Sequence, residues 1–322
     1  MAAAFCDSGT ASVAMLRFCG VNFIETPQAL LGSERAARSL RRLSEIGANC
    51  VALVPFLWQS RPDDCDVVWG SAVPPERLAM GIRQAKAAGL HVMLKPHIWI
   101  PGHWAGQVAM KSESEWQRWM TSYQSHMVML AHLAAEHEVD ALFIGTELRL
   151  TSQRGEWRDI IAAVRNQYHG IVSYVAHGPE EAEKIEFWDQ LDAVAASLYP
   201  SLGNAHDRRS WEAAMTDTAT RLQGVARNSG KPCWIGEMGI RSAKGATSKP
   251  WESPEERRAM ADPALQAAVI DAWLDVAQRM GIETALVWRW FSDPDGGGAT
   301  DTDFTVQNKP AEAVLQRRWV KT

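Results

Sequence analysis

The chain has 322 residues, of which 46% are hydrophobic and 22% are charged. This composition is typical of a soluble globular protein, and the length suits one large barrel or two smaller domains. A formal net charge of −5 indicates no basic surface, so nucleic acid is not an expected partner. No apolar run approaches the ~18 residues of a membrane span, so no membrane partner is expected either.

Residues 1–16 contain no Lys or Arg, and Asp7, Ser8 and Gly9 interrupt their apolar content. The segment therefore lacks the basic start and the continuous apolar core of a signal peptide, and we expect a cytoplasmic protein. The five cysteines include no CxxC pair, and three of them lie in predicted strands. A cysteine in a strand is usually a small buried hydrophobe, so we expect no disulfide framework.

Eight short apolar runs alternate with longer amphipathic stretches along the chain. In order, the predicted strands span 17–23, 49–56, 91–96, 140–145, 171–176, 193–199, 231–236 and 284–290. The predicted helices span 34–46, 75–88, 114–136, 156–167, 211–228, 263–280 and 311–319, with a weaker one over 183–190. Four predicted helices end at a glycine, which favours the left-handed conformation of a C-terminal cap: Gly47, Gly89, Gly230 and Gly281.

This alternation predicts an α/β fold of the (β/α)8 TIM barrel type. We expect one catalytic domain over residues 1–322, with its core over about 17–319, because no linker, repeat or composition shift divides the chain. The alternative is a doubly wound open sheet, but no GxGxxG or GxxxxGK[ST] motif follows the first strand. In a barrel, the chemistry is expected at the carboxyl ends of the strands.

Two glutamates stand at such ends. Glu147 follows the apolar run 140–145, and Glu237 follows the run 232–236. A carboxylate where a buried strand reaches the surface is costly unless it is paired or used. Two such groups can form a retaining glycosidase site, in which one carboxyl protonates the leaving oxygen and the other attacks the sugar carbon. The alternative for each is a strand-end salt bridge with Arg149 or Arg241.

Other polar and aromatic side chains follow predicted strands, and we expect eight of them to bind substrate: Asn22, Trp58, Lys95, His97, Trp99, Tyr199, Arg241 and Trp288. The count of 15 tryptophans supports sugar binding, because an indole face stacks on the C–H face of a pyranose. Tryptophans on predicted helices, such as Trp116 and Trp157, are instead expected to pack in the core. His97 could alternatively be a rim histidine with a structural partner.

No metal or other cofactor is expected. His97, His103 and His177 form no H-x-x-x-H pattern and have no acidic partner at ligand spacing. The aspartates around the glycines at 296–298 lack the order of a calcium loop.

The order and spacing of five motifs resemble glycoside hydrolase family 113: KPH at 95–97, IGTEL at 144–148, SLYP at 197–200, KPCWIGEMG at 231–239 and KPA at 309–311. This family belongs to clan A, the retaining barrels with catalytic glutamates after strands four and seven, and its known members are chiefly β-mannanases and β-mannosidases. One departure is Thr146, because much of the clan has there an asparagine that holds the sugar 2-hydroxyl.

The resemblance implies a retaining β-glycoside hydrolase that acts on β-1,4-mannosidic linkages of a carbohydrate partner, with Glu147 as acid/base and Glu237 as nucleophile. The acid must hold its proton near neutral pH, which predicts a raised pKa for Glu147. Glu237 must stay ionised, with Tyr199 or Arg241 as donor. The alternatives are another sugar specificity within the retaining β-glycosidases and a catalytically silent glycan-binding barrel.

Overall fold

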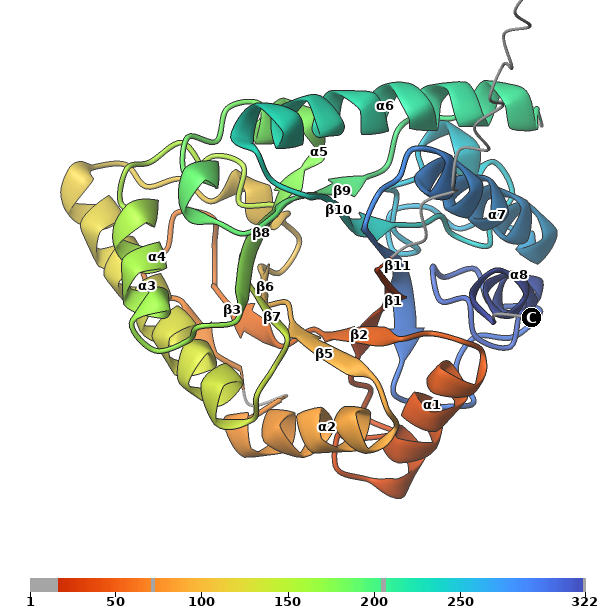
Figure 1. Cartoon of the computed structure of the whole chain (residues 1–322), viewed down its shortest axis with the longest axis horizontal. Coiled ribbons are helices and arrows are strands. Elements are labelled where there is room, and N and C mark those ends of the chain that lie inside the picture. Colours follow the sequence, from red (N-terminus) through yellow and green to blue (C-terminus); the bar gives the residue numbers. More distant parts are fainter. Residues whose placement is uncertain (1–16, 71–72, 204–206, 321–322) are drawn as a thin grey trace, which may run out of the picture.

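The computed structural model describes residues 17–70, 73–203 and 207–320. Eight parallel strands close into a barrel in the order β1-β11-β10-β9-β8-β7-β5-β2, and helices surround it (Figure 1). The strands match the predicted ones closely: β1 Phe18–Ile24, β2 Cys50–Leu53, β5 His91–Leu94, β7 Ala141–Thr146, β8 Ile171–His177, β9 Val194–Leu198, β10 Cys233–Met238 and β11 Thr284–Phe291. The predicted TIM barrel is confirmed.

The helices are α1 Glu34–Glu45, α2 Pro75–Ala87, α3 Glu113–Glu136, α4 Trp157–Arg165, α5 Gly178–Ala182, α6 Arg208–Ser229, α7 Pro263–Arg279 and α8 Pro310–Trp319, with short 3-10 turns η1 Ala105–Gln107, η2 Trp188–Gln190 and η3 Ala246–Ser248. Ser33 caps α1 by accepting a hydrogen bond from the Ala36 amide. The predicted C-terminal glycines have φ of 92°, 79°, 65° and 65° in chain order. None of the helices within the described ranges is long and apolar enough to cross a membrane.

The predicted helix over 183–190 is wrong. The chain instead forms α5 directly after β8 and then η2. Pro179 explains the earlier start, because proline is favoured in the first turn of a helix, where its missing N–H needs no partner.

A second, three-stranded sheet was not predicted. It has the order β4-β3-β6 and consists of β3 Phe56–Trp58, β4 Val68–Trp69 and β6 His97–Trp99. The predicted strands 49–56 and 91–96 are each split at a proline, Pro55 and Pro96, because proline cannot donate to the ladder of a central strand. The chain after each split forms the new sheet, which carries Trp58, His97 and Trp99.

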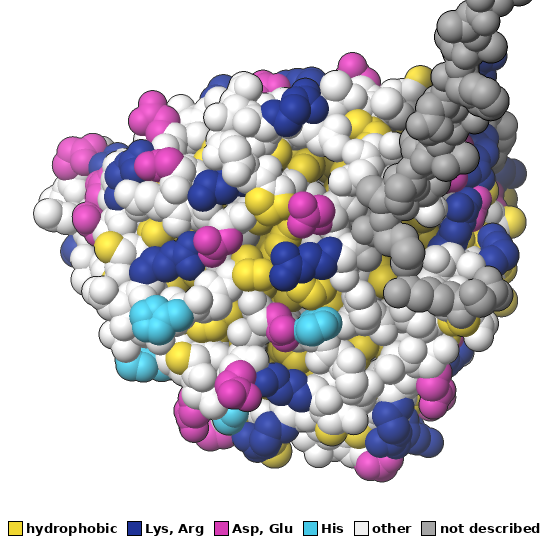
Figure 2. Space-filling model, viewed as in Figure 1, with side chains coloured by type: hydrophobic (Ala, Val, Ile, Leu, Met, Phe, Trp, Pro, Cys, Tyr) yellow, Lys and Arg dark blue, Asp and Glu magenta, His cyan; other side chains and the backbone are white. Residues whose placement is uncertain are grey.

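The core has two layers. A cluster that includes Phe18, Phe143 and Trp234 fills the inside of the barrel, and a larger cluster packs between the strands and the helices. The helix tryptophans Trp116 and Trp157 are buried in this outer layer, as predicted. The four described cysteines are free thiols. On the face shown in Figure 2, Lys and Arg side chains are interspersed with Asp and Glu side chains over the described surface.

Gly20 on β1 lies against the neighbouring strand so closely that a Cβ there would sit 2.0 Å from the carbonyl oxygen of Cys50. We expect Gly20→Ala to lower the free energy of unfolding by about 1–3 kcal/mol or more, because strand backbone cannot move aside as a side chain can. Urea denaturation measures this. Gly155→Ala is the matched control, since a Cβ there meets nothing within 4 Å, and its stability should stay within about 0.5 kcal/mol of wild type. Equal stability of the two variants would contradict the prediction.

Candidate active site

Glu237 lies near the end of β10, is 4% exposed and is held by three donors, two from the segment after β5 and one from the end of β9. Lys95 Nζ forms an ion pair with its Oε1, and His97 Nε2 lies 2.9 Å from the same oxygen. The Tyr199 hydroxyl donates to Oε2 over 3.2 Å. Burial raises the pKa of Glu237, but the Lys95 cation and the His97 hydrogen bond outweigh it, so the pKa lies below its ordinary value. Glu237 is therefore ionised.

The partners of Glu237 are affected in turn. The Lys95 side chain is completely buried, which lowers its pKa, while the charge of Glu237 acts in the opposite direction. Burial lowers the pKa of His97, and the Lys95 cation lowers it further. His97 is thus held as a neutral ring beside a carboxylate–ammonium pair, with Nε2 3.0 Å from Lys95 Nζ.

Glu147 follows β7 and is held by different groups. The Trp104 indole donates to its Oε2 over 2.9 Å, and His177 Nδ1 lies 3.2 Å from its Oε1. Its backbone has a φ of 56°, in the left-handed region that a glutamate rarely adopts. The charge of Glu147 raises the pKa of Glu237, so the two carboxyls lie close enough to interact electrostatically.

The prediction of a raised pKa for Glu147 is wrong. Burial does raise it, but the hydrogen bond and charge of His177, with the Trp104 hydrogen bond, lower the pKa to about 2. Burial lowers the pKa of His177, but the contacts with Glu147 outweigh it and leave the pKa raised. The proton of this pair therefore resides on the imidazole. His177 stands at the end of β8 and Trp104 lies in the loop after β6, so both follow predicted strands, but the sequence does not show that they contact Glu147.

Two predicted substrate ligands are corrected. Asn22 is completely buried, and its amide nitrogen donates to the carbonyl of Gly236 over 3.2 Å. Arg241 is 1% exposed, and its guanidinium donates to backbone carbonyls of the loops after β10 and β11, those of Ser253, Arg257 and Thr302. Both side chains are buried in the scaffold around the site. Sequence alone shows that they follow strands but not that they turn inward.

Among the described residues, neither glutamate forms the alternative strand-end salt bridge with Arg149 or Arg241. The ion pairs of the two glutamates involve Lys95, His97 and His177. Arg241 has Glu252 as its acidic neighbour, at 3.7 Å.

Aromatic rings extend the site away from Glu237. The Trp288 ring centroid lies 5.4 Å from that of His97 and 5.3 Å from Lys95 Nζ. Phe56 lies beyond His97, with ring centroids 5.9 Å apart, and it contacts Trp99 at 6.0 Å. Trp99 is 50% exposed and lies 6.2 Å from Trp58. The predicted residues Trp58, His97, Trp99 and Trp288 thus form one continuous surface beside the carboxylate.

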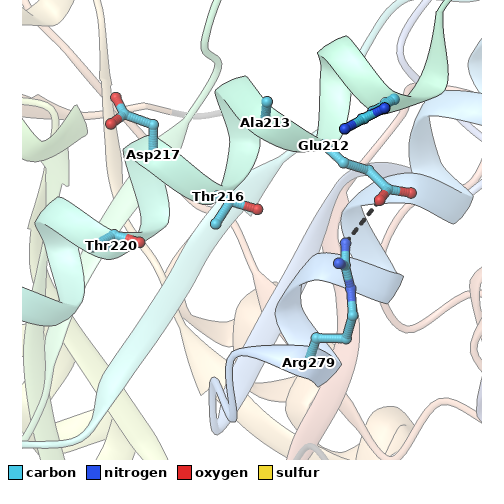
Figure 3. Close-up of a pocket in the computed structure, with 7 residues that line it drawn as sticks. Glu212, Ala213, Thr216, Asp217, Thr220 and Arg279 are labelled. Atoms are coloured by element: carbon cyan, nitrogen blue, oxygen red, sulfur yellow. Dashed lines mark hydrogen bonds and ion pairs between the residues drawn. The ribbon is translucent and has the colours of Figure 1, made fainter.

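Neither a hollow on the outer surface nor a cluster of metal ligands among the described residues offers an alternative active site. A hollow of about 510 Å³ lies on the outer face of α6, where Glu212 pairs with Arg279 over 2.8 Å (Figure 3). It contains no strand-end residue and is open to solvent. Within the part of the chain that the structure describes, no group of three or more His, Cys, Asp or Glu side chains could hold a metal ion.

Residues 24–309 match the family model of Glycoside Hydrolase Family 113. The chain belongs to this family. Its resemblance to the family on sequence motifs is thereby confirmed, and the protein is a glycoside hydrolase. A comparison with curated protein sequences finds no significant match.

Solved structures of this family are similar over nearly the whole chain. The GH113 β-mannanase AaManA from Alicyclobacillus acidocaldarius, in complex with ManMIm, is 25% identical with a TM-score of 0.83, covering 95% of this chain and 97% of that one. A structure described as a complex of GH113 β-1,4-mannanase gives the same identity and TM-score and is covered to 99%. The family 5 mannosidase from Rhizomucor miehei shares the fold at 10% identity, with a TM-score of 0.67 and 95% and 93% coverage.

The burial of the ion pair between Lys95 and Glu237 leads to a prediction about the free energy of unfolding. Lys95→Met leaves a buried carboxylate without its cation, which we expect to cost about 3–5 kcal/mol of unfolding free energy. Glu237→Gln leaves the cation unpaired and is also destabilising. The double variant removes both charges, so its loss should be smaller than the sum of the two single losses by more than about 1 kcal/mol. Urea denaturation of all three variants tests this. Additive losses would show that the two groups do not stabilise each other.

Proposed function

We propose that the protein hydrolyses β-1,4-mannosidic linkages with retention of configuration, using Glu237 as nucleophile and Glu147 as general acid/base. The observation that carries the proposal is the unequal support of the two carboxyls. Glu237 is paired with a buried cation and is held ionised, whereas Glu147 is paired with a histidine that can carry a proton. The similar solved structures that are named β-mannanases support the choice of mannan as substrate. We also propose that residues of about 17–319 act as a single catalytic domain.

The reaction has two steps. In the first, a carboxylate oxygen of Glu237 forms a bond to the anomeric carbon while the bond from that carbon to the leaving oxygen breaks, and Glu147 gives the leaving oxygen its proton. In the second, Glu147 takes a proton from water, and the water oxygen attacks the same carbon and releases Glu237. Lys95, His97 and Tyr199 fix the orientation of the nucleophile throughout.

The proton for the first step comes from the pair that Glu147 forms with His177. In the resting protein His177 carries it, and the contact of 3.2 Å is the route by which it reaches Glu147. Glu181 and Arg149 also face His177; Glu181 raises its pKa and Arg149 lowers it. A sugar that excludes water from Glu147 favours the neutral carboxyl, which shifts the proton onto the acid.

This arrangement predicts the pH dependence of turnover. The raised pKa of His177 keeps the proton on the pair below that pKa, and the proton is lost as pH rises through it. In His177→Asn the side chain remains polar but holds no ionisable proton, so the alkaline limb of the kcat/KM profile should move to lower pH. The profile is measured with an aryl β-mannoside. An alkaline limb that stays where it is in wild type would show that Glu147 keeps its own proton.

The two glutamates can be told apart by their variants. Glu237→Ala should abolish turnover on every substrate, and azide should restore it with an inverted product by occupying the vacated space. Glu147→Ala should lose roughly 10²–10⁴-fold on mannan, whose leaving oxygen needs a proton, but far less in glycosylation by activated aryl mannosides. Azide should then yield a retained β-mannosyl azide, identified by NMR. The reverse pattern would exchange the two roles, and wild-type rates in either variant would reject the site.

The sugar specificity is tested with a panel of aryl β-glycosides on the wild-type protein. We expect kcat/KM to be highest for the β-mannoside. A higher value for the corresponding glucoside or galactoside would leave a glycosidase of another specificity, and no turnover of any β-glycoside or manno-oligosaccharide would favour a silent glycan-binding barrel.

A further inference from the structure

Glu181 on α5 is a buried carboxylate, 2% exposed, that lies next to the pair of Glu147 and His177. The Tyr174 hydroxyl donates to its Oε1 over 2.7 Å, and the backbone amide of His177 donates to its Oε2 over 2.6 Å. Both oxygens thus act as acceptors, which is the pattern of an ionised carboxylate. Neither donor is a cation, so the cost of burying this charge is only partly offset. Burial and, to a lesser extent, the charge of Glu147 raise its pKa, against these hydrogen bonds and one from Ser152.

The Tyr174 hydroxyl connects Glu181 to the backbone next to Glu147. It accepts a hydrogen bond over 2.9 Å from the amide of Leu148, the residue that follows Glu147. The Tyr174 ring is fixed in turn, because it packs so closely against Gly145 on β7 that a Cβ there would come within 2.7 Å of it. The hydrogen bonds from Glu181 through Tyr174 therefore reach the backbone beside the left-handed Glu147.

We propose that Glu181 is a positioning residue for Glu147 and acts on it by two routes. Its negative charge stabilises the protonated ring of His177, which carries the proton for Glu147. Its hydrogen bond with Tyr174 holds the backbone beside Glu147 in place. The inference rests on the proposed function, because it uses the role of Glu147 as acid. Glu181 acts only through its neighbours, since both of its oxygens are occupied by them.

The first route follows from the charges around the His177 ring. Burial lowers the pKa of His177, the hydrogen bond and charge of Glu147 raise it, and the charge of Glu181 raises it further. Arg149 lowers it, and Glu180 also faces the ring. Removal of the charge of Glu181 therefore lowers the pKa of His177. The proton is present below that pKa and is lost as pH rises through it, so without Glu181 it is lost at lower pH.

A purely structural role for Glu181 leads to a different expectation. His177 is the N-cap residue of α5, and Glu181 accepts its amide, so the carboxylate could serve only to cap the helix. An amide oxygen accepts the same hydrogen bond, and an amide nitrogen can still bond to the Tyr174 hydroxyl. Glu181→Gln therefore keeps the cap and removes the charge.

A histidine NMR titration follows the protonation of His177 without any need for turnover, with the signal assigned by its absence in His177→Asn. In Glu181→Gln we expect His177 to titrate at lower pH than in wild type. Glu183→Gln is the matched control, because Glu183 is close in the chain but pairs with Arg221 of α6 over 2.9 Å. In this control His177 should titrate as in wild type. An unchanged titration in Glu181→Gln, in a sample whose amide spectrum shows a folded protein, would overturn the first route.

The second route is tested by Tyr174→Phe, which removes the hydrogen bond to the Leu148 amide and keeps the charge of Glu181. The acid matters for a phenyl β-mannoside and much less for a 2,4-dinitrophenyl β-mannoside, whose leaving group needs no proton. We expect kcat/KM on the phenyl mannoside to fall by roughly 3- to 10-fold more than kcat/KM on the dinitrophenyl mannoside. The dinitrophenyl rate also reports that the variant is folded. An equal loss on both substrates, or no loss on either, would overturn the second route.

Failure of the inference differs from failure of the proposed function. A wild-type protein that turns over neither mannoside would overturn the proposed function, and with it the part of Glu181 in the reaction. An active wild type, with variants in which neither the His177 titration nor the ratio of the two rates changes, would overturn the inference alone.

Discussion

The ion pair between Lys95 and Glu237 is the interaction on which the rest of the site depends. Burying a charged group costs several kcal/mol, and here both partners are almost completely removed from water. Neither charge is tolerable without the other, so the end of β5 and the end of β10 must be held in fixed register across the barrel. The neutral state of His97 follows from the same cation, and the orientation of the carboxylate follows from both. The closed sheet supplies the rigidity that this requires.

A second buried cation does the same for the loops. Lys309 at the start of α8 contacts Asp301 over 2.6 Å and Ser242 over 2.7 Å, and thereby ties the loop after β11 to the loop after β10. Arg241 adds hydrogen bonds to carbonyls along both loops. The long loop after β10 is thus anchored at its base by buried charged groups. Although this loop has little regular secondary structure, these contacts fix it to the loop after β11.

Much of the fold could be predicted from the sequence, because each barrel strand is a short buried run that is followed along the chain by a helix. The second sheet was missed, since strands of two or three residues have no periodicity to detect. Both glutamates that we propose as catalytic could be singled out in the sequence because each comes at the end of a buried run, where a carboxylate is unusual. Arg241 and Asn22 were misplaced because alternation along a strand predicts a face but not where a long or amide side chain turns. The lowered pKa of Glu147 depends on His177, a contact between β7 and β8 that spacing along the chain does not reveal.

If Glu147 has the catalytic role that we propose, its left-handed backbone sets stability against function at a single position. A non-glycine residue there carries roughly 1–3 kcal/mol of strain, and a burial cost for its carboxyl is added to it. Glycine or asparagine would relieve the strain. A lineage of such barrels released from selection for turnover should therefore lose this glutamate early and become more heat-resistant as it does so. Stable, inactive descendants of the fold are a natural outcome of this one φ angle.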